Sequence, residues 1–198
     1  MISDRLDRCL PDRLVRNILK SIEEEMGLYS LHLMLHQAGL ERFVSAARSG
    51  DMRASECTSL LKGIRDYYGR GARGSLIRIG SRWFELLVRD CSLVQKIKVG
   101  TVRLLPVEMR RLRILDFLAR QLCGGDGRIA IHTLDHDIIF VDQTSQFTFG
   151  LEACEPVCWM TQGMIQRALA GGGESEPDIE EISCQAMGGD ACKFHIRF

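Results

Sequence analysis

The sequence lacks several features that would assign it to a familiar class of protein. It has no excess of charge of either sign, because 26 lysines and arginines balance 26 aspartates and glutamates. A protein that binds a nucleic-acid backbone needs a basic excess or a basic face, so we expect no nucleic-acid partner. No apolar run approaches the roughly 20 residues of a membrane-spanning helix, so we expect no membrane span.

A secretory signal peptide is also missing, since charged residues follow Met1 closely and no apolar segment comes after them. We therefore expect a cytoplasmic protein in which most of the eight cysteines are reduced. In that compartment a cluster of cysteines is more often a metal site or a catalytic site than a disulfide framework.

Nucleotide-binding motifs are absent as well. The glycine-rich stretch at residues 69–74 lacks the Gly-Lys-Ser/Thr ending of a phosphate-binding loop, and no strand is predicted before it. It does not fit the dinucleotide fingerprint either, which needs a strand, then glycines, then a helix. We interpret it as a solvated connector, and we find no fingerprint of a nicotinamide or flavin that would supply a hydride.

Apolar residues at helical spacing predict a helix-rich first part of the chain. One strand is predicted there, at residues 75–80. From residue 127 the pattern changes to the alternation that is typical of strands. Strands are predicted at residues 128–134, 137–142 and 146–150 and in a final hairpin, with a helix at 156–170. Helices packed on an antiparallel sheet define an α+β fold.

The carboxyl-terminal hairpin holds the strongest candidate site. Cys184 and Cys192 flank a Gly-Gly-Asp turn, and strands on the two sides of such a turn face each other at about 5 Å. Cys158 opens the predicted helix that precedes the hairpin. Thiolates with a nitrogen or oxygen ligand are the usual donors of zinc sites, so these cysteines are candidate metal ligands.

The spacing does not decide the fourth ligand. Glu181 is the natural candidate, but residues i and i+3 of a regular strand point to opposite faces. Glu181 therefore needs a bulge near Ser183 to reach the same site as Cys184. Without such a bulge, Glu180 or Cys154 can take its place. The alternative interpretation is that the cysteines are ordinary buried residues, which pack as small hydrophobic side chains.

The residues at the carboxyl terminus resemble the signature of the vinyl-4-reductase domain family, also described as predicted hydrocarbon-binding proteins. The matching positions are Glu181, Cys184, Ala186, Gly188, Cys192, Phe194 and Ile196. The Cys158 helix and the early helix that ends at Ala38 and Gly39 fit the same pattern, so the resemblance spans most of residues 12–198. It implies the fold of the Bet-type subunits of the TRAPP vesicle-tethering complex, a homodimer and an apolar ligand cavity.

Some members of this family are aromatic-sensing regulatory domains of bacterial transcription activators, in which three cysteines and one glutamate hold a structural zinc. The spacing of those ligands matches Cys158, Glu181, Cys184 and Cys192, so the resemblance implies a zinc on these four residues. Four protein ligands leave no position open for a substrate, which is typical of a structural site. The activators' ATPase and DNA-binding domains are not within these residues, so the activator function is not implied.

The function that this resemblance implies is binding of a small apolar or aromatic molecule, hydrocarbon-like or tetrapyrrole-like, by a homodimeric, zinc-stabilised sensory or carrier domain. We assign residues 1–52 to a helical segment for dimerisation or packing, and residues 53–198 to the ligand-binding domain. The residues that we consider for the pocket, each of which also suits a plain core position, are Trp83, His132, Phe140 and Trp159.

Two other functions remain open. The family name suggests a vinyl reductase or an accessory protein of bacteriochlorophyll biosynthesis, but no cofactor fingerprint supports a reductase, so we favour a protein that is not an enzyme. The other alternative is an interaction subunit that uses a TRAPP-like dimer surface and has no small ligand.

Overall fold

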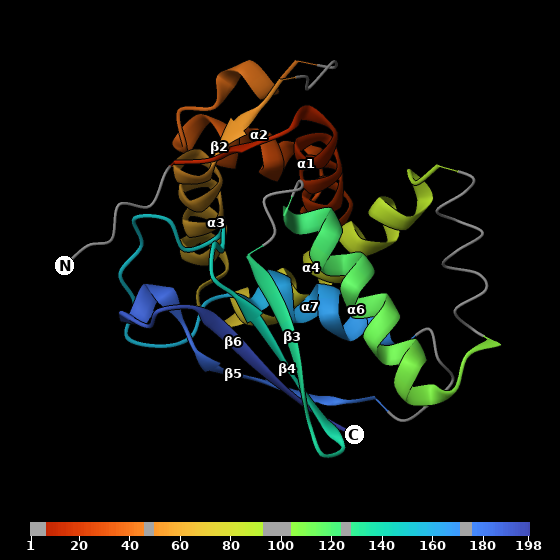
Figure 1. The fold of residues 1–198 in the computed structure, drawn as a ribbon. Helices are drawn as coiled ribbons and strands as arrows, with labels where there is room; N and C mark the ends of the chain where they lie inside the picture. Colours follow the sequence, from red (N-terminus) through yellow and green to blue (C-terminus); the bar gives the residue numbers. More distant parts are fainter. Residues whose placement is uncertain (1–6, 46–49, 93–103, 124–127, 171–175) are drawn as a thin grey trace.

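The computed structural model describes residues 7–45, 50–92, 104–123, 128–170 and 176–198. The helices are α1 (Asp12–Met26), α2 (Leu28–Gln37), α3 (Ala54–Tyr68), α4 (Ala72–Arg89), α6 (Val107–Cys123) and α7 (Trp159–Ala170). The strands are β1 (Cys9–Leu10), β2 (Met52–Arg53), β3 (Ile129–Leu134), β4 (Asp137–Asp142), β5 (Asp178–Ser183) and β6 (Cys192–Arg197). This combination of helices and antiparallel strands confirms the predicted α+β class (Figure 1).

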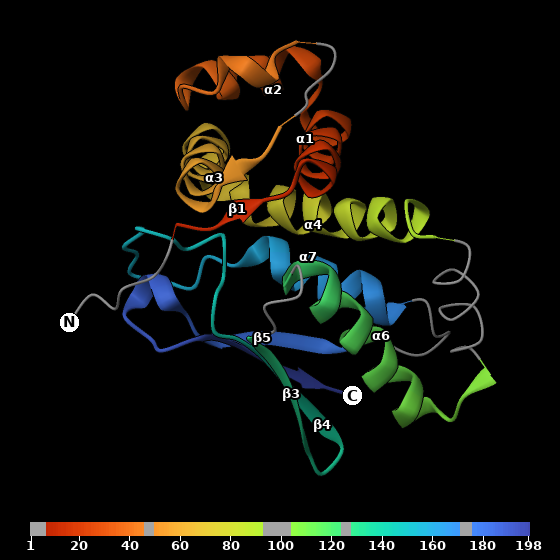
Figure 2. The same cartoon turned by 45° about the horizontal axis from the view of Figure 1, so that its top comes forward.

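The four longer strands form one antiparallel sheet in the order β3-β4-β6-β5. Along β6 the side chains alternate, so that Cys192, Phe194 and Ile196 are buried and their neighbours are half-buried. The buried side faces the helices, and Figure 2 shows α7 lying between the sheet and α4. Beyond α4 come α1 and α3, with α2 outermost (Figure 2). The sheet therefore has one covered face and one outer face.

The helices α4 and α7 pack with their backbones in contact. A Cβ on Gly80 of α4 would collide with the backbone carbonyl of Met160, and a Cβ on Gly163 of α7 would collide with that of Ile77. The Ser81 hydroxyl adds a hydrogen bond to the Gly163 carbonyl at 3.1 Å. The two glycines thus let the helices approach closely, and the first residue of the candidate site immediately precedes α7.

The first helix shows how the sequence pattern produces these layers. It buries Leu14, Ile18 and Ile22 at helical spacing, while Glu24 remains exposed on the opposite side. Gly27, at φ 82°, ends this helix and begins α2. Among the described residues, no helix combines the length and the apolar content that crossing a bilayer requires.

Two local predictions were wrong and one was right only in part. Residues 75–80 form part of α4 rather than a strand. Residues 69–71 are an exposed 3₁₀ turn that connects α3 to α4, as predicted, but residues 72–74 already belong to α4. Leu76, Ile79 and Trp83 are buried at helical spacing, so packing on the neighbouring helices outweighs the short β-like run. Residues 146–150, predicted as a strand, form turns instead.

Candidate metal centre

Four predicted ligands meet in the structure: Cys158, Glu181, Cys184 and Cys192. One donor atom of each lies within 4.8 Å of the others. The Sγ atom of Cys158 is 3.3 Å from that of Cys192 and 3.9 Å from that of Cys184. A tetrahedral zinc with Zn–S bonds of about 2.3 Å holds two sulfurs roughly 3.8 Å apart. The Sγ atoms of Cys158 and Cys184 therefore already have the spacing of zinc ligands, and that of Cys192 lies about 0.5 Å closer to Cys158 than such a site requires.

Each cysteine sits at the end of a secondary-structure element. Cys158 immediately precedes α7, and its carbonyl accepts the first helical hydrogen bond, from the Gln162 amide at 3.0 Å. Cys184 follows β5 and opens a one-turn 3₁₀ helix, while Cys192 begins β6. Gly188, at φ 87°, lets the chain turn back tightly between them. A metal on these residues would join α7 to the last two strands.

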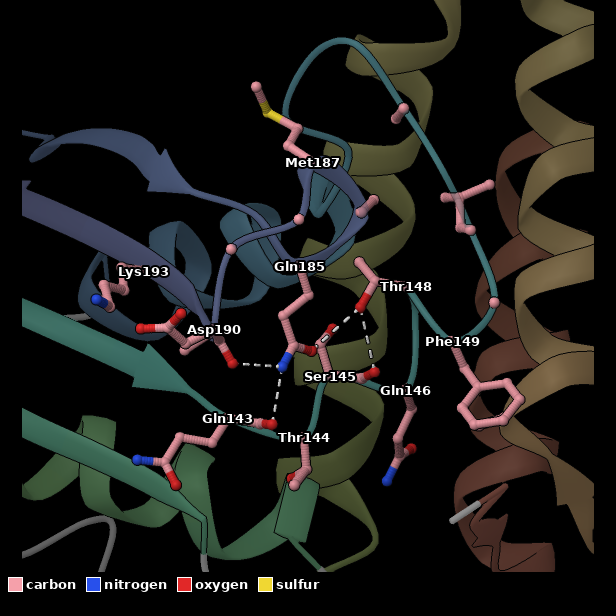
Figure 3. A pocket seen from close by; sticks show the side chains of 18 of the residues that line it. Gln143, Thr144, Ser145, Gln146, Thr148, Phe149, Gln185, Met187, Asp190 and Lys193 are labelled. Carbon is pink, nitrogen blue, oxygen red and sulfur yellow. Dashed lines mark hydrogen bonds between the residues drawn. The ribbon is translucent and has the colours of Figure 1, made fainter. Parts of the chain in front are cut away.

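Two further polar groups contact the thiols. The backbone amide of Gln185 donates to the Sγ atom of Cys192 at 3.4 Å, and the Ser145 hydroxyl lies 4.0 Å from the Sγ atom of Cys158. Both residues also line the pocket that is drawn in Figure 3. Partners of this kind orient metal ligands. The sequence did not predict them, because neither residue belongs to a recognisable motif.

A bulge in β5 brings Glu181 into the cluster. The register shifts between Glu181 and Ser183, so that both Glu181 and Cys184 face inward. The Glu181 Oε2 atom accepts a hydrogen bond from the Cys158 amide at 2.9 Å. Its Oε1 atom is buried and has no hydrogen-bond partner among the described residues. Burying such an oxygen unpaired is costly, and a metal ion in the cluster would satisfy it.

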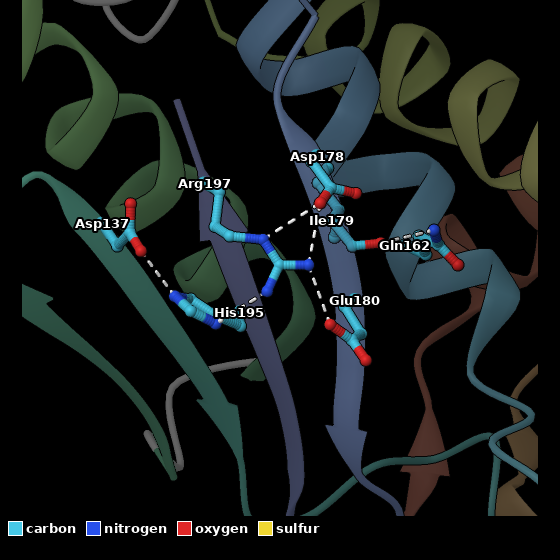
Figure 4. A network of polar contacts seen from close by, with 7 residues as sticks. All are labelled: Asp137, Gln162, Asp178, Ile179, Glu180, His195 and Arg197. Atoms are coloured by element: carbon cyan, nitrogen blue, oxygen red, sulfur yellow. Dashed lines mark hydrogen bonds and ion pairs between the residues drawn. The ribbon is translucent and has the colours of Figure 1, made fainter.

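The structure places the two alternative ligands elsewhere. Glu180 lies on the outer face of the sheet, where its Oε2 atom accepts a hydrogen bond from Arg197 at 2.8 Å (Figure 4). Arg197 also donates to Asp178 at 2.8 Å, so Glu180 is part of an exposed ion-pair network. Cys154 is exposed and is not part of the cluster.

The electrostatics of the cluster favour a bound cation. Hydrogen bonds with Cys184 and Cys192, followed by burial, raise the pKa of the Cys158 thiol well above its usual value. Burial raises the pKa of Glu181 to about 8. Hydrogen bonds from the other two thiols lower the pKa of Cys184, so negative charge concentrates there. A divalent metal would stabilise all four ligands in the deprotonated form that coordination requires.

Of the four residues considered for an organic ligand, Trp83 and Phe140 belong to the hydrophobic core, Trp159 packs against it, and His132 lies outside it. Trp83 and Phe140 are fully buried, and Trp159 is half-buried at the start of α7. His132 is exposed. Its neighbour Ile131 pairs with Phe140, so Phe140 faces the helices and His132 faces the outer side of the sheet.

This architecture defines a class of protein: an α+β domain with helices stacked on one face of an antiparallel sheet and a three-cysteine, one-glutamate cluster at its carboxyl end. Residues 145–198 match the sequence model of the vinyl-4-reductase domain. The match includes all four residues of the cluster, and it confirms the resemblance to the vinyl-4-reductase domain family over those residues. Among curated proteins, none matches this chain.

Solved structures of H-NOX proteins share the fold. The unliganded Fe(II) H-NOX protein from K. algicida has a TM-score of 0.63 at 16% identity, covering 94% of this chain and 95% of its own. The H-NOX protein from S. oneidensis in the Fe(II)NO state has a TM-score of 0.61 at 14% identity, with coverages of 94% and 98%. An oxygen-binding H-NOX domain related to soluble guanylate cyclases has a TM-score of 0.60 at 12% identity, covering 96% of this chain and 95% of its own. Identities this low show the fold alone. That the fold is also that of the TRAPP Bet-type subunits stays a prediction.

Proposed function

We propose that the chain binds a small apolar or aromatic molecule as a homodimeric sensory or carrier domain, stabilised by a zinc ion on Cys158, Glu181, Cys184 and Cys192. The match of residues 145–198 to the vinyl-4-reductase domain is the observation that supports this most strongly. The similar folds include an oxygen-binding H-NOX domain and a protein studied for its heme redox potential. Other proteins with a similar fold therefore bind small molecules.

The ligand site in this proposal lies between α6 and the inner face of β3, which pack against each other. Ile129 and Ile131 point to the same side of the sheet as the buried Phe140, yet they are only half-buried. Leu112 and Phe117 of α6 are half-buried as well and pack on the same core. Apolar side chains left partly exposed on the inner side of a fold are suited to cover an apolar ligand.

The positions of the histidines argue against a histidine-ligated heme in this space. None of the chain's five histidines lies on α6 or on the inner face of the sheet, within the residues that the structure describes. They are found on α2, on the β3–β4 hairpin and on the outer face of β6: His32, His36, His132, His136 and His195. An imidazole, a common protein ligand of heme iron, is therefore not available there. We favour an organic ligand that is held by apolar contacts.

The zinc has a structural role in this proposal. Four protein ligands complete a tetrahedral shell, so no position remains for a substrate or a reactive water. All three cysteines are buried, which keeps solvent away from such a shell. The metal would tie the start of α7 to the end of the sheet and so hold the wall of the ligand site in place.

The homodimer in this proposal is supported by α2. This outermost helix exposes Leu28, Tyr29 and Leu33, and Tyr29 is 83% exposed. Large apolar side chains that gather on one helix mark an interaction surface. The proposal also keeps residues 1–52 as the segment for dimerisation or packing, residues 53–198 as the ligand-binding domain, and the cytoplasm as the location.

Native mass spectrometry of freshly purified protein tests these parts together, and we expect a dimer with one zinc per chain and a bound organic mass. A matched pair of variants locates the ligand. Ile131→Lys places a charge on the inner face of the sheet, and Ile139→Lys places it on the outer face of the next strand. Naphthalene binding, followed by tryptophan fluorescence, should weaken on the order of tenfold, or about 1.4 kcal/mol, in Ile131→Lys alone. Equal losses in both variants, or no naphthalene binding by the native chain, would contradict the proposed site.

A further inference from the structure

A groove at the end of β4 borders the metal cluster through Ser145 and Gln185 and lies apart from the proposed apolar site. It is bordered by residues 143–153, by the turn at residues 185–191 and by Arg8, which precedes β1 (Figure 3). We call it the β4-end groove. Its volume is about 1170 Å³, whereas sites for small molecules usually measure roughly 300–1,000 Å³. Its size therefore suits a longer ligand.

The floor of the β4-end groove is held by the buried side chain of Gln185. Its Nε2 atom donates to the carbonyls of Gln143 and Asp190, at 2.8 and 2.9 Å. Its Oε1 atom accepts a hydrogen bond from the buried Thr148 hydroxyl at 3.3 Å. These bonds, drawn in Figure 3, fix the loop and the turn relative to each other, so the groove is preformed.

Three cationic side chains line the β4-end groove from different elements. Arg128 immediately precedes β3, and its carbonyl accepts a hydrogen bond from the Gln143 amide at 3.0 Å. Lys193 lies on β6, opposite Val141 of β4. Arg8 approaches from the amino-terminal side. Alternation along the strands puts Arg128 and Lys193 on the same outer face of the sheet, with β4 between them.

The spacing and charge of these side chains indicate the kind of ligand. Within the described residues, neither Arg128 nor Lys193 has an ion pair or a side-chain hydrogen bond, whereas Arg8 interacts electrostatically with the carboxyl of Asp142. Strands lie about 4.8 Å apart, so Arg128 and Lys193 are separated by roughly 10 Å. One small anion cannot span that distance, but alternate carboxylates on an extended chain lie on one face of it at intervals of roughly 6.6 Å, and the long side chains of arginine and lysine bridge the remaining gap.

Apolar side chains complete the β4-end groove. Phe149 is half-buried, and Met187 is 48% exposed at the rim. Methionine adapts its shape to an apolar partner, and an aromatic ring adds a large contact area. We propose that the β4-end groove binds an extended acidic segment of another polypeptide, whose carboxylates pair with Arg128 and Lys193 and whose apolar residue packs on Phe149 and Met187. The proposal depends on neither the organic ligand nor the dimer.

Fluorescence anisotropy with a defined probe tests this docking site on the metal-loaded chain. The probe is a fluorescein-labelled ten-residue peptide in which aspartate and glutamate alternate with leucine and phenylalanine. The double variant Arg128→Glu with Lys193→Glu should weaken binding at least tenfold, because both proposed partners become repulsive. The matched control is Arg70→Glu with Arg73→Glu, which makes the same charge change at two exposed positions outside the groove. It should change the dissociation constant less than twofold.

Hydrogen exchange supplies a second readout, since the bound peptide should slow exchange at residues 143–153. Metal content and the thermal transition of each variant show that it remains folded. Four outcomes would overturn the proposal. They are no binding of the acidic peptide, equal losses in both double variants, equal binding of a probe with glutamine and asparagine in place of the acids, and displacement of the peptide by equimolar inorganic phosphate.

Discussion

Serine is nearly isosteric with cysteine but keeps its proton at neutral pH, so Cys→Ser variants isolate the contribution of thiolate ligands. We expect Cys192→Ser to lose the zinc and to unfold at a lower temperature. A structural zinc contributes roughly 10–16 kcal/mol to peptides that have no core of their own, so we expect a loss of several kcal/mol in this larger domain. Cys154→Ser is the control, because Cys154 is exposed and lies outside the cluster.

Elemental analysis and a thermal scan measure this prediction. Retention of one zinc per chain by Cys192→Ser would show that the metal is bound elsewhere. Loss of zinc from Cys154→Ser would instead show that this exposed thiol takes part in binding.

Asp142 is a buried carboxyl at the end of β4 whose Oδ1 atom accepts a hydrogen bond from the Thr144 amide at 2.9 Å. Burial raises its pKa from 3.8 to about 6. The folded state therefore binds this proton more tightly than the unfolded state, and the free energy of unfolding falls as the pH rises from about 4 to about 6. Asp142→Asn keeps the oxygen acceptor and buries no charge, so it should be more stable at pH 7.5 by on the order of 2 kcal/mol.

Urea denaturation of both proteins between pH 4 and pH 8 checks this prediction. The difference in unfolding free energy should grow between about pH 4 and about pH 6 and then level off. A difference that does not depend on pH would mean that the Asp142 pKa is not raised by folding.

Single residues also show where the sequence was informative. Cys158, Cys184 and Cys192 were identified because thiols at turns and helix starts are recognisable from spacing. Glu181 was only one of three candidates, because its position depends on a bulge that alternation does not reveal. Ser145, which lies 4.0 Å from the Cys158 thiol, gave no signal, because its place results from how a turn folds over the cluster.

At the scale of secondary-structure elements, the packing of α4 on α7 depends on two reciprocal glycines. A Cβ at Gly80 or Gly163 would overlap the backbone of the facing helix, which cannot move aside as a flexible side chain does. We expect Gly80→Ala and Gly163→Ala each to reduce stability by about 1–3 kcal/mol or more, as overpacking does. Gly71→Ala is the control, because a Cβ there meets nothing within 4 Å.

Chemical denaturation of the three variants measures this effect. Both contact glycines should show lower midpoints than the native chain, and the control should match it or exceed it. Full stability of Gly80→Ala would mean that the two helices lie farther apart than the structure shows.

The secondary-structure elements differ in how clearly the sequence predicts them. The helix-rich first part of the chain was predicted, because the apolar residues of long amphipathic helices such as α1 and α6 recur over several turns. Residues 75–80 were misassigned, because a short run of β-branched and apolar residues does not distinguish a strand from a buried helix face. The close approach to α7 selects the helix, and that contact is not visible within the segment itself.

At the scale of the whole molecule, the exposed apolar side chains of α2 lead to a prediction about assembly. The double variant Tyr29→Glu with Leu33→Glu adds two charges to this surface, and we expect it to be monomeric under conditions in which the native chain forms dimers. Lys62→Glu is the control, because it makes the same change in net charge at an exposed position on α3. Sedimentation equilibrium distinguishes the two states. A dimer that persists in the double variant would place the interface on another surface.

The central claim is that one carboxylate and three thiolates bind a zinc ion, which stabilises the carboxyl end of the fold. X-ray absorption at the zinc edge, combined with elemental analysis of freshly purified protein, tests it most directly. We expect one zinc per chain, with three sulfur neighbours at about 2.3 Å and one oxygen at about 2.0–2.2 Å. A chain that contains no metal, or a zinc shell without sulfur, would contradict it.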